Sequence, residues 1–271
     1  MSIIGQNKIQ SLFNQSLYTI PHSIILCGES GSGRKSVCKE FADRFQMEYK
    51  FVDSKIDVDF VNDLMSSSSL TLVVFDGDKL IERDQNSLLK LIEEPSDNVY
   101  CVIITECVDF LLPTIKNRCQ VWNMESYTKE QLQSFSQPSE SQDLILELAH
   151  TPGQVEEYQQ QPLQEIYQFA EKVIDNIDKA AIANTLMITE RVAFKDEKDK
   201  YDYQLFGKLL LYVSKNRVLD SQDSKFIQGY NLTNQYLQTQ RKYPRLDKRE
   251  LFEHYLVTLW KGMRENGIKT T

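Results

Sequence analysis

The sequence lacks a long apolar run, paired cysteines and an excess of positive charge. No segment approaches the roughly 18 apolar residues that a membrane-spanning helix needs. The start of the chain, MSIIGQNKIQ, has no basic region followed by an apolar one, as a secretory signal would have. We therefore expect a soluble, cytoplasmic protein that makes no membrane contact.

The five cysteines contain no C-x-x-C spacing, and three of them lie in or beside apolar runs. They are Cys27, Cys38, Cys101, Cys107 and Cys119. This pattern predicts reduced, buried thiols, with no disulfide and no zinc site. The net charge of -8 argues against a protein that binds DNA by itself through a broad basic face. It leaves open DNA handling inside a complex whose other members carry the positive charge.

The apolar residues that are present, 41% of 271, can form the cores of two or three domains. Short continuous apolar runs, typical of buried parallel strands, occur at residues 24–27, 49–52, 70–75, 100–105 and 119–122. Helical spacing of apolar residues occurs around and between them, at 9–17, 37–47, 58–64, 85–94 and 110–117. This alternation predicts a doubly wound parallel sheet.

Proline and aspartate mark the expected ends of two of these helices. Asp84 is expected to be the N-cap of the helix at 85–94, and Pro95 its stop. Pro113 is expected to interrupt the helix at 110–117 near its start.

From residue 125 onward the sequence shows helical periodicity without strand-like runs. The segments SQPSESQ (136–142) and HTPGQ (150–154) predict turns, so a small helical domain is expected first, followed by an all-helical one. The charged run at 195–200 is expected to be solvated. The five basic residues within 241–249 could pair with acidic neighbours or DNA, although a solvated loop is favoured.

A glycine-rich turn between a predicted strand and a predicted helix, CGESGSGRKS, has the form of a phosphate-binding loop. Its candidate nucleotide-binding residues are Gly28, Gly31, Gly33, Arg34, Lys35 and Ser36. Aligned with G-x-x-x-x-G-K-[ST], the loop has arginine in the lysine position and lysine in the hydroxyl position. An insertion of one residue would restore Lys35 and Ser36 as the usual pair. The loop can hold a phosphate but departs from the pattern that positions Mg²⁺.

The third predicted strand ends in VVFDGD, where nucleotide-hydrolysing proteins carry acidic residues. Asp76 fits the position that helps to hold Mg²⁺. The adjacent position, which usually holds the carboxylate that polarises water, is Gly77. Asp78 is expected to face elsewhere, as a turn residue or an N-cap of the next segment.

Two further motifs make a resemblance specific. They are NSLLKLIEEP at residues 86–95 and LLPTIKNRC at 111–119, supported by Ile4-Gly5-Gln6 at the start and by IPHSIILCGESGSG. In order and spacing, residues 3–155 resemble the AAA+ module of the clamp-loader subunits of bacterial DNA polymerase III. Within that family the sequence is most similar to the members that do not hydrolyse ATP.

The resemblance implies a role for Arg118 in another subunit. In the family, the arginine of the S-R-C motif is a finger that stabilises charge on the phosphoryl group in a neighbour's ATP site. Here Asn117 replaces the serine. The alternative is a surface arginine that caps the preceding short helix. Thr105 matches the family's polar sensor, whereas Gln154 replaces the arginine that senses the γ-phosphate.

The implied fold class is an α/β AAA+ domain with a parallel five-stranded sheet, followed by a small helical lid domain and an all-α collar domain. The corresponding boundaries are 1–124 for the RecA-like domain with its degenerate P-loop, 125–162 for the lid and 163–271 for the collar. In the collar, apolar residues are expected to face other subunits or the domain's own core, the latter for most of them. These residues are Phe206, Leu209, Leu210, Leu211, Val213, Phe252, Tyr255 and Trp260.

The implied function is that of a non-catalytic stator in a five-subunit ring that loads the sliding clamp onto primer-template DNA. Its partners would be the gamma/tau ATPase subunits and the delta subunit. No cofactor is required, and ATP or ADP binding without hydrolysis stays open. The four-cysteine zinc module of many relatives is missing, so no metal is expected.

Two enzyme classes are alternatives. An active AAA+ ATPase would use the shifted loop with Lys35, Ser36 and Asp76, although Gly77 and Gln154 speak against it. A small-molecule P-loop kinase would need an acceptor-binding motif, and the sequence contains none that we recognise.

Overall fold

The computed structural model describes residues 4–53, 56, 58–193, 201–221, 223–243 and 246–267. The chain forms two compact units, Met1–Tyr158 and Gln159–Thr271. The predicted division of the first unit at residue 125, with a lid ending at 162, stays a prediction. The charged run at 195–200 and residues 244–245 of the basic segment lie outside the described residues.

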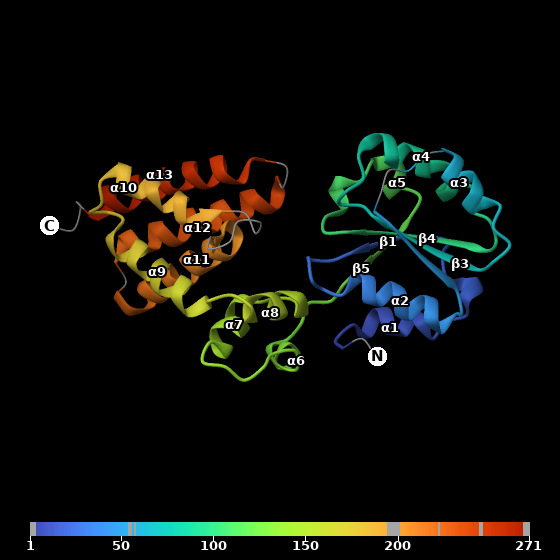
Figure 1. The fold of residues 1–271 in the computed structure, drawn as a ribbon, viewed down its shortest axis with the longest axis horizontal. Helices are drawn as coiled ribbons and strands as arrows, with labels where there is room; N and C mark the ends of the chain where they lie inside the picture. The colour runs from blue at the N-terminus through green and yellow to red at the C-terminus, as the bar shows by residue number, and fades with distance from the viewer. Residues whose placement is uncertain are drawn as a thin grey trace. The chain divides into compact units, whose positions relative to one another are not determined.

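The first unit is built on a five-stranded parallel sheet with the order β2-β3-β4-β1-β5 (Figure 1). Its strands are β1 (Ser23–Cys27), β2 (Glu48–Val52), β3 (Thr71–Asp76), β4 (Val99–Thr105) and β5 (Gln120–Asn123). The predicted parallel sheet is therefore confirmed. Because β4 lies between β1 and β3, the acidic end of β3 and the strand that leads into the glycine-rich turn are not neighbours in the sheet.

Helices cover both faces of this sheet (Figure 1). One face packs against α1 (Asn7–Phe13) and α2 (Arg34–Arg44), and the other against α3 (Val58–Met65), α4 (Glu82–Glu93) and α5 (Pro113–Lys116). Successive strand residues point to opposite faces, so Ile24 and Leu26 join one core and Ile25 the other. Burial on both faces explains why the strands read as continuous apolar runs.

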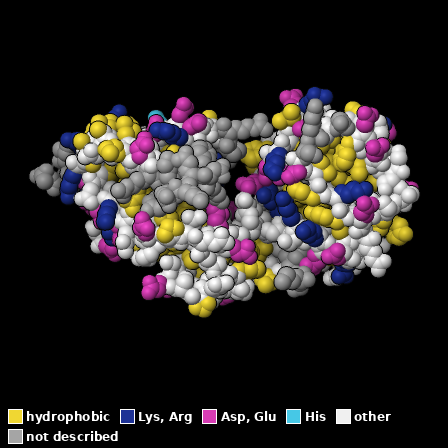
Figure 2. Space-filling view, in the orientation of Figure 1, with side chains coloured by type: hydrophobic (Ala, Val, Ile, Leu, Met, Phe, Trp, Pro, Cys, Tyr) yellow, Lys and Arg dark blue, Asp and Glu magenta, His cyan; other side chains and the backbone are white. Residues whose placement is uncertain are grey.

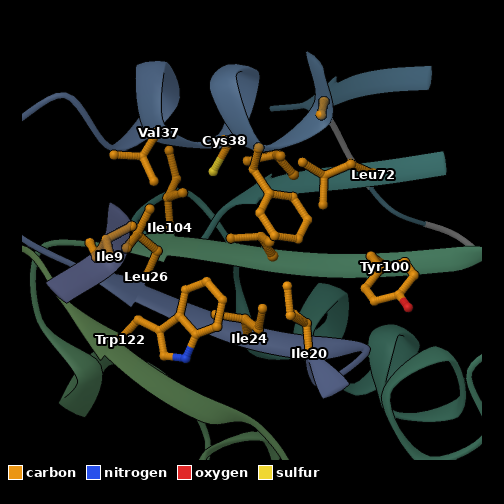
Figure 3. Packing of buried hydrophobic residues seen from close by; sticks show 14 of the residues in the cluster. Ile9, Ile20, Ile24, Leu26, Val37, Cys38, Leu72, Tyr100, Ile104 and Trp122 are labelled. Carbon is orange, nitrogen blue, oxygen red and sulfur yellow. The ribbon is translucent and has the colours of Figure 1, made fainter. Parts of the chain in front are cut away.

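The core beneath α2 fixes the position of the glycine-rich turn (Figure 3). Val37 and Cys38 project from α2 towards the sheet, where they meet Leu26 and Ile104 (Figure 3). The ring of Phe41, also on α2, lies 5.4 Å from that of Phe13 and 6.5 Å from that of Trp122, measured between ring centroids. Because β1 and α2 are both anchored in this core, the turn that joins them is held at both ends.

Three helix ends differ from their predictions. Helix α4 begins at Glu82, and Asp84 lies inside it, where Oδ2 accepts the backbone N–H of Ile81 at 3.4 Å. Pro113 is the first residue of α5 and does not interrupt it, because a proline in that position lacks only an N–H that would have no helical partner. The predicted turn at 150–154 contains the start of a helix, because Pro152 is likewise tolerated as the first residue of α8.

The rest of the first unit contains two short 3₁₀ helices, η1 (Leu17–Thr19) and η2 (Val108–Phe110), and three α-helices. The α-helices are α6 (Lys129–Gln133), α7 (Gln142–Leu148) and α8 (Pro152–Gln159). Thr128 caps α6 by accepting the N–H of Gln131 at 3.3 Å.

The described part of the second unit is mostly helical. Its elements are α9 (Leu163–Asn176), α10 (Ile182–Leu186), η3 (Met187–Arg191), β6 (Val192–Ala193), β7 (Tyr201–Asp202), α11 (Tyr203–Ser221), α12 (Ser224–Lys242) and α13 (Lys248–Gly267). The two-residue strands β6 and β7 pair in parallel and were not predicted. A two-residue pairing leaves no periodic signal in the sequence.

Most of the apolar residues singled out for the collar form the core of the second unit itself. Those buried in it are Phe206, Leu209, Leu210, Val213, Phe252 and Tyr255. Leu211 and Trp260 are half-buried, and the indole N–H of Trp260 donates to the carbonyl of Ala180 at 2.9 Å. The expectation that most of these residues serve their own core is confirmed.

Within the described residues, no helix is long and apolar enough to cross a membrane. Nor do three or more His, Cys, Asp or Glu side chains of this part gather in a way that could hold a metal ion. The cysteines are free thiols, with Cys38 and Cys101 buried. Burial raises the pKa of Cys38 to about 12, so this thiol is protonated at neutral pH.

Replacing Phe252 by alanine should destabilise the second unit. The Phe252 ring is fully buried and lies within 6.1 Å of the rings of Tyr203, Phe206 and Tyr236. Phe252→Ala is expected to lower the free energy of unfolding by about 3–5 kcal/mol, measured by urea denaturation. Leu219, which is 70% exposed, provides the control, and Leu219→Ala should change it by less than about 0.5 kcal/mol. Equal effects would contradict this account of the core.

Candidate functional site

The glycine-rich turn joins the end of β1 to the start of α2, as the sequence predicted. Gly31 and Gly33 have φ angles of 75° and 90°, a left-handed conformation that side chains disfavour. At Gly28 a Cβ atom would lie 2.5 Å from Cγ of Met124, so only a residue without a side chain fits. The glycines thus shape the turn, whether or not it holds a phosphate.

Three consecutive carbonyl groups of the turn, those of residues 30–32, accept hydrogen bonds from the segment that follows the sheet. The hydroxyl of Thr151 donates to the first at 2.9 Å. The backbone N–H of Gly153 donates to the second at 3.0 Å. The hydroxyl of Tyr127 donates to the third at 2.8 Å. Residues 127–153 therefore clamp the outer side of the turn.

The clamp brings two glycine backbones into direct contact. A Cβ atom built on Gly153 would lie 2.6 Å from Cα of Gly31, and one on Gly31 would lie 2.8 Å from the hydroxyl oxygen of Thr151. Residue 154, where active relatives are expected to carry an arginine, is close by in the first turn of α8. The side-chain oxygen of Gln154 accepts the backbone N–H of His150 at 2.9 Å, which folds this side chain back along its own segment.

Gln6, the third residue of the Ile4-Gly5-Gln6 motif, secures the start of the clamping segment. Its side chain is fully buried, donates to the carbonyl of Glu125 at 2.9 Å and accepts the N–H of Glu125 at 2.7 Å. Burial raises the pKa of Tyr127, so its hydroxyl stays protonated and able to donate to the turn. Tyr127 was not predicted as a site residue, because nothing in the local sequence pattern marks a partner 95 residues away.

Arg34, in the position of the usual lysine, is paired with two carboxylates. Its Nη1 lies 3.2 Å from Oδ2 of Asp78 and its Nη2 lies 3.7 Å from Oε1 of Glu106. The Arg34 side chain is only 11% exposed. The positive charge that would face a phosphate is therefore already balanced inside the protein.

Asp78 is the centre of this network. It lies in a turn, as expected, but the expectation that its side chain faces elsewhere is wrong. Besides Arg34, its Oδ1 accepts the hydroxyl of Thr105 at 2.7 Å and the backbone N–H of Glu106 at 2.9 Å. Asp78 thus reaches across to the end of β4, because β4 is the direct neighbour of β3. Thr105, the predicted polar sensor, is fully buried and is held by Asp78.

The surroundings of Glu106 raise the pKa of its carboxyl group. Burial raises its pKa above the ordinary value and the negative charge of Asp78 raises it further, while Arg34 opposes both effects. A further anion at this place would be repelled by two carboxylates.

The acidic end of β3 does not provide the usual pair of carboxylates. Asp76 is mostly buried, and its Oδ2 lies 3.6 Å from the ammonium group of Lys79, which is also 3.6 Å from Asp53. At Gly77 a Cβ atom would lie 2.8 Å from Cγ2 of Ile103 and 3.0 Å from the carbonyl oxygen of Ile104. The missing carboxylate therefore has no room here without a backbone shift.

The placement of Lys35 and Ser36 does not support the alternative alignment of the loop, in which these two residues form the usual Lys-Ser pair. The ammonium group of Lys35 lies 3.9 Å from the centroid of the Phe51 ring, a cation–π contact with β2. Ser36 is exposed on α2. Lys35 therefore points to the edge strand of the sheet, away from the turn.

Together these residues do not fit a hydrolysing magnesium–nucleotide site. Arg34 is paired with Asp78 and Glu106, a side chain at position 77 would require a backbone shift, and the side-chain oxygen of Gln154 accepts the N–H of His150. The structure brings the turn, Thr105 and Asp78 together, but the charges they carry are paired with each other.

Arg118 belongs to a different part of the surface. It follows α5, and its contacts within the described residues are with α5 and α4. Its Nη1 donates to the carbonyl of Thr114 at 3.0 Å, and its Nε lies 2.8 Å from Oε1 of Glu93. The first contact is the helix-capping interaction that the alternative interpretation expects. The side chain is nevertheless 42% exposed, so part of the guanidinium group faces solvent.

Comparison with solved structures agrees with the fold. The crystal structure of a DNA polymerase III gamma subunit-related protein from Thermotoga maritima aligns with 94% of this chain and 99% of its own, with a TM-score of 0.51 and 14% identity. The shared fold consists of a parallel five-stranded sheet, with a glycine-rich turn after its first strand, and a helical region that follows. The predicted fold class is therefore confirmed.

The sequence comparisons point to one subunit within that class. Residues 52–128 match the family model described as DNA polymerase III, delta subunit. The delta' subunit of DNA polymerase III from Haemophilus influenzae is 29% identical over 160 residues, which cover 54% of this chain and 48% of that protein. The delta' subunit from Buchnera aphidicola subsp. Baizongia pistaciae is 42% identical over 52 residues, 19% of this chain and 16% of that protein.

These matches confirm that this chain resembles the delta-prime subunit of the DNA polymerase III clamp loader. They show similarity to that subunit over part of the chain. The aligned part of the chain spans about half the length of the Haemophilus relative.

The contact between Gly31 and Gly153 can be tested by adding one methyl group. Gly153 is in the first turn of α8, where alanine is normally well tolerated, so a loss of stability in Gly153→Ala would come from the contact. We expect the free energy of unfolding of the first unit to fall by about 1–3 kcal/mol, measured by chemical denaturation. In the control Gly229→Ala, the nearest atom to the new Cβ is Sδ of the flexible Met263 at 3.2 Å, and stability should be little changed. Unchanged stability of Gly153→Ala would contradict the clamped arrangement.

Proposed function

We propose that this chain is a non-catalytic clamp-loader subunit, a stator of a five-subunit ring that loads the sliding clamp onto primer-template DNA. Its partners are the gamma/tau ATPase subunits and the delta subunit. It donates Arg118 to the ATP site of the adjacent ATPase subunit. The observation that carries the proposal is the contrast between two arginines: Arg34 is 11% exposed and paired with two carboxylates of its own chain, whereas Arg118 is 42% exposed.

A stator has to keep its shape while its neighbours bind and release nucleotide. The hydrogen bonds from Thr151, Gly153 and Tyr127 hold the turn without any ligand. The network around Asp78 occupies Arg34 and Thr105, two of the residues predicted to contact a nucleotide. No cofactor is required for this role, zinc included, and any bound ATP or ADP would not be hydrolysed.

Arg118 has the chemistry that a finger needs. A guanidinium group keeps its charge at all physiological pH values and offers several N–H donors to phosphate oxygens. A cation placed beside the transferring phosphoryl group stabilises the charge of the transition state.

DNA and the clamp would be handled through the complex. The net charge of the chain is -8, and on the face drawn in Figure 2 the Lys and Arg side chains lie among Asp and Glu side chains. Such a surface gives little non-specific attraction to DNA by itself.

The finger is tested by Arg118→Ala in a loader reconstituted with the neighbouring subunits. The complex should still assemble, but its DNA-stimulated ATP turnover should fall by up to about a thousandfold, as for other arginine fingers. Arg118→Lys should also be impaired, because lysine lacks the planar fork of donors. Arg44, an exposed arginine on α2 that donates to Asn14, provides the control and should leave turnover unchanged as Arg44→Ala. Full turnover with Arg118→Ala would refute the assignment.

The isolated chain should show no ATP hydrolysis above a buffer blank. The reason is that Gly77 replaces the water-polarising carboxylate and Arg34 is held by Asp78 and Glu106. A sensitive phosphate-release assay on the purified chain measures this. Turnover that disappears in Asp76→Ala would favour the active ATPase alternative.

A further inference from the structure

Helix α4 ends with two adjacent glutamates, Glu93 and Glu94, at a position where the helix dipole favours cations. Their side chains are solvent-exposed, so packing in the core does not account for the presence of glutamate at these two positions. The side chain of Glu94 makes no hydrogen bond or ion pair with other described residues, whereas Oε1 of Glu93 lies 2.8 Å from Nε of Arg118. An ion pair with exposures of 44% and 42% adds little to stability. Its more specific effect is on the orientation of the arginine.

The contacts of Arg118 leave one edge of its guanidinium group unused by the described residues. Arginine has five N–H donors. Nε lies 2.8 Å from Oε1 of Glu93 in an ion pair, and one N–H of Nη1 donates to the carbonyl of Thr114. The remaining donors, on Nη1 and Nη2, are the ones available to a ligand outside this chain.

Both anchors of Arg118 are held by buried residues. Glu93 directly follows Leu91 and Ile92, which are 0% and 5% exposed in the core beneath α4. Thr114 precedes Ile115, which is fully buried. An arginine side chain that is free to rotate loses entropy when it binds, and anchors on rigid elements reduce that loss.

We infer that Glu93 is a positioning residue for Arg118: it fixes the Nε side of the guanidinium group so that the opposite edge faces the phosphate of a nucleotide bound by the neighbouring subunit. This inference rests on the proposed role of Arg118. Glu93 does not touch the nucleotide; it acts through the arginine.

The test compares four chains in the reconstituted complex, each assayed for DNA-stimulated ATP turnover: Glu93→Ala, Glu93→Gln, Glu94→Ala and Arg118→Ala. Glu93→Ala should lower kcat about tenfold with KM for ATP unchanged, because a misplaced catalytic group acts on the chemical step. Glu93→Gln keeps the size of the side chain but removes its charge, so it should be impaired like Glu93→Ala, because the contact is an ion pair. Glu94→Ala removes the same charge one residue away and should behave as the unmodified chain.

The double variant Glu93→Ala with Arg118→Ala separates positioning from a general structural effect. If Glu93 acts through Arg118, removing it from the Arg118→Ala background should cause no further loss. An equal loss in both backgrounds, or a Glu93→Ala complex that matches Glu94→Ala or exceeds normal turnover, overturns the positioning role. Full turnover with Arg118→Ala alone overturns the proposed finger itself, so the two failures are distinguishable.

Discussion

The ion pair between Arg34 and Asp78 decides what the glycine-rich turn can do. In a phosphate-binding loop the basic residue at this position has to be free to meet the anion, but here it is 11% exposed and held at 3.2 Å from a carboxylate. Asp78 also accepts from Thr105 and from the N–H of Glu106, so the carboxylate that holds Arg34 is itself held in place. The network makes the turn a structural joint between β1, β4 and α2.

The clamp on the outer side of the turn depends on the same arrangement. Thr151, Gly153 and Tyr127 can reach the carbonyls of residues 30–32 only because the turn has the compact shape that Gly31 and Gly33 permit. Gly153 in turn has to be a glycine, since a Cβ atom would meet Gly31 at 2.6 Å. A unit whose loop is closed by its own chain is suited to act as a fixed support, while Arg118 is presented on a separate surface formed by α4 and α5.

The sequence predicted the sheet and the position of the turn because both leave local signals. Continuous apolar runs mark strands buried on both faces, and the glycines mark the turn. It failed at Asp78, since the strand order that brings Asp78 to Thr105 depends on β4 lying between β1 and β3, which spacing along the chain does not reveal. It also did not identify Tyr127 and Glu93, whose roles come from partners distant in the sequence. Motif resemblance supplied Arg118, and local chemistry alone would have favoured helix capping.

The account can be tested most directly by a structure of the assembled loader bound to a non-hydrolysable ATP analogue. It predicts that the guanidinium group of Arg118 lies within hydrogen-bonding distance of the γ-phosphate in the adjacent subunit, with Nε still on Glu93. It also predicts that Arg34 remains paired with Asp78. A γ-phosphate seated in the turn at residues 28–36, with Arg34 released from Asp78 and Arg118 distant from every nucleotide, would contradict it.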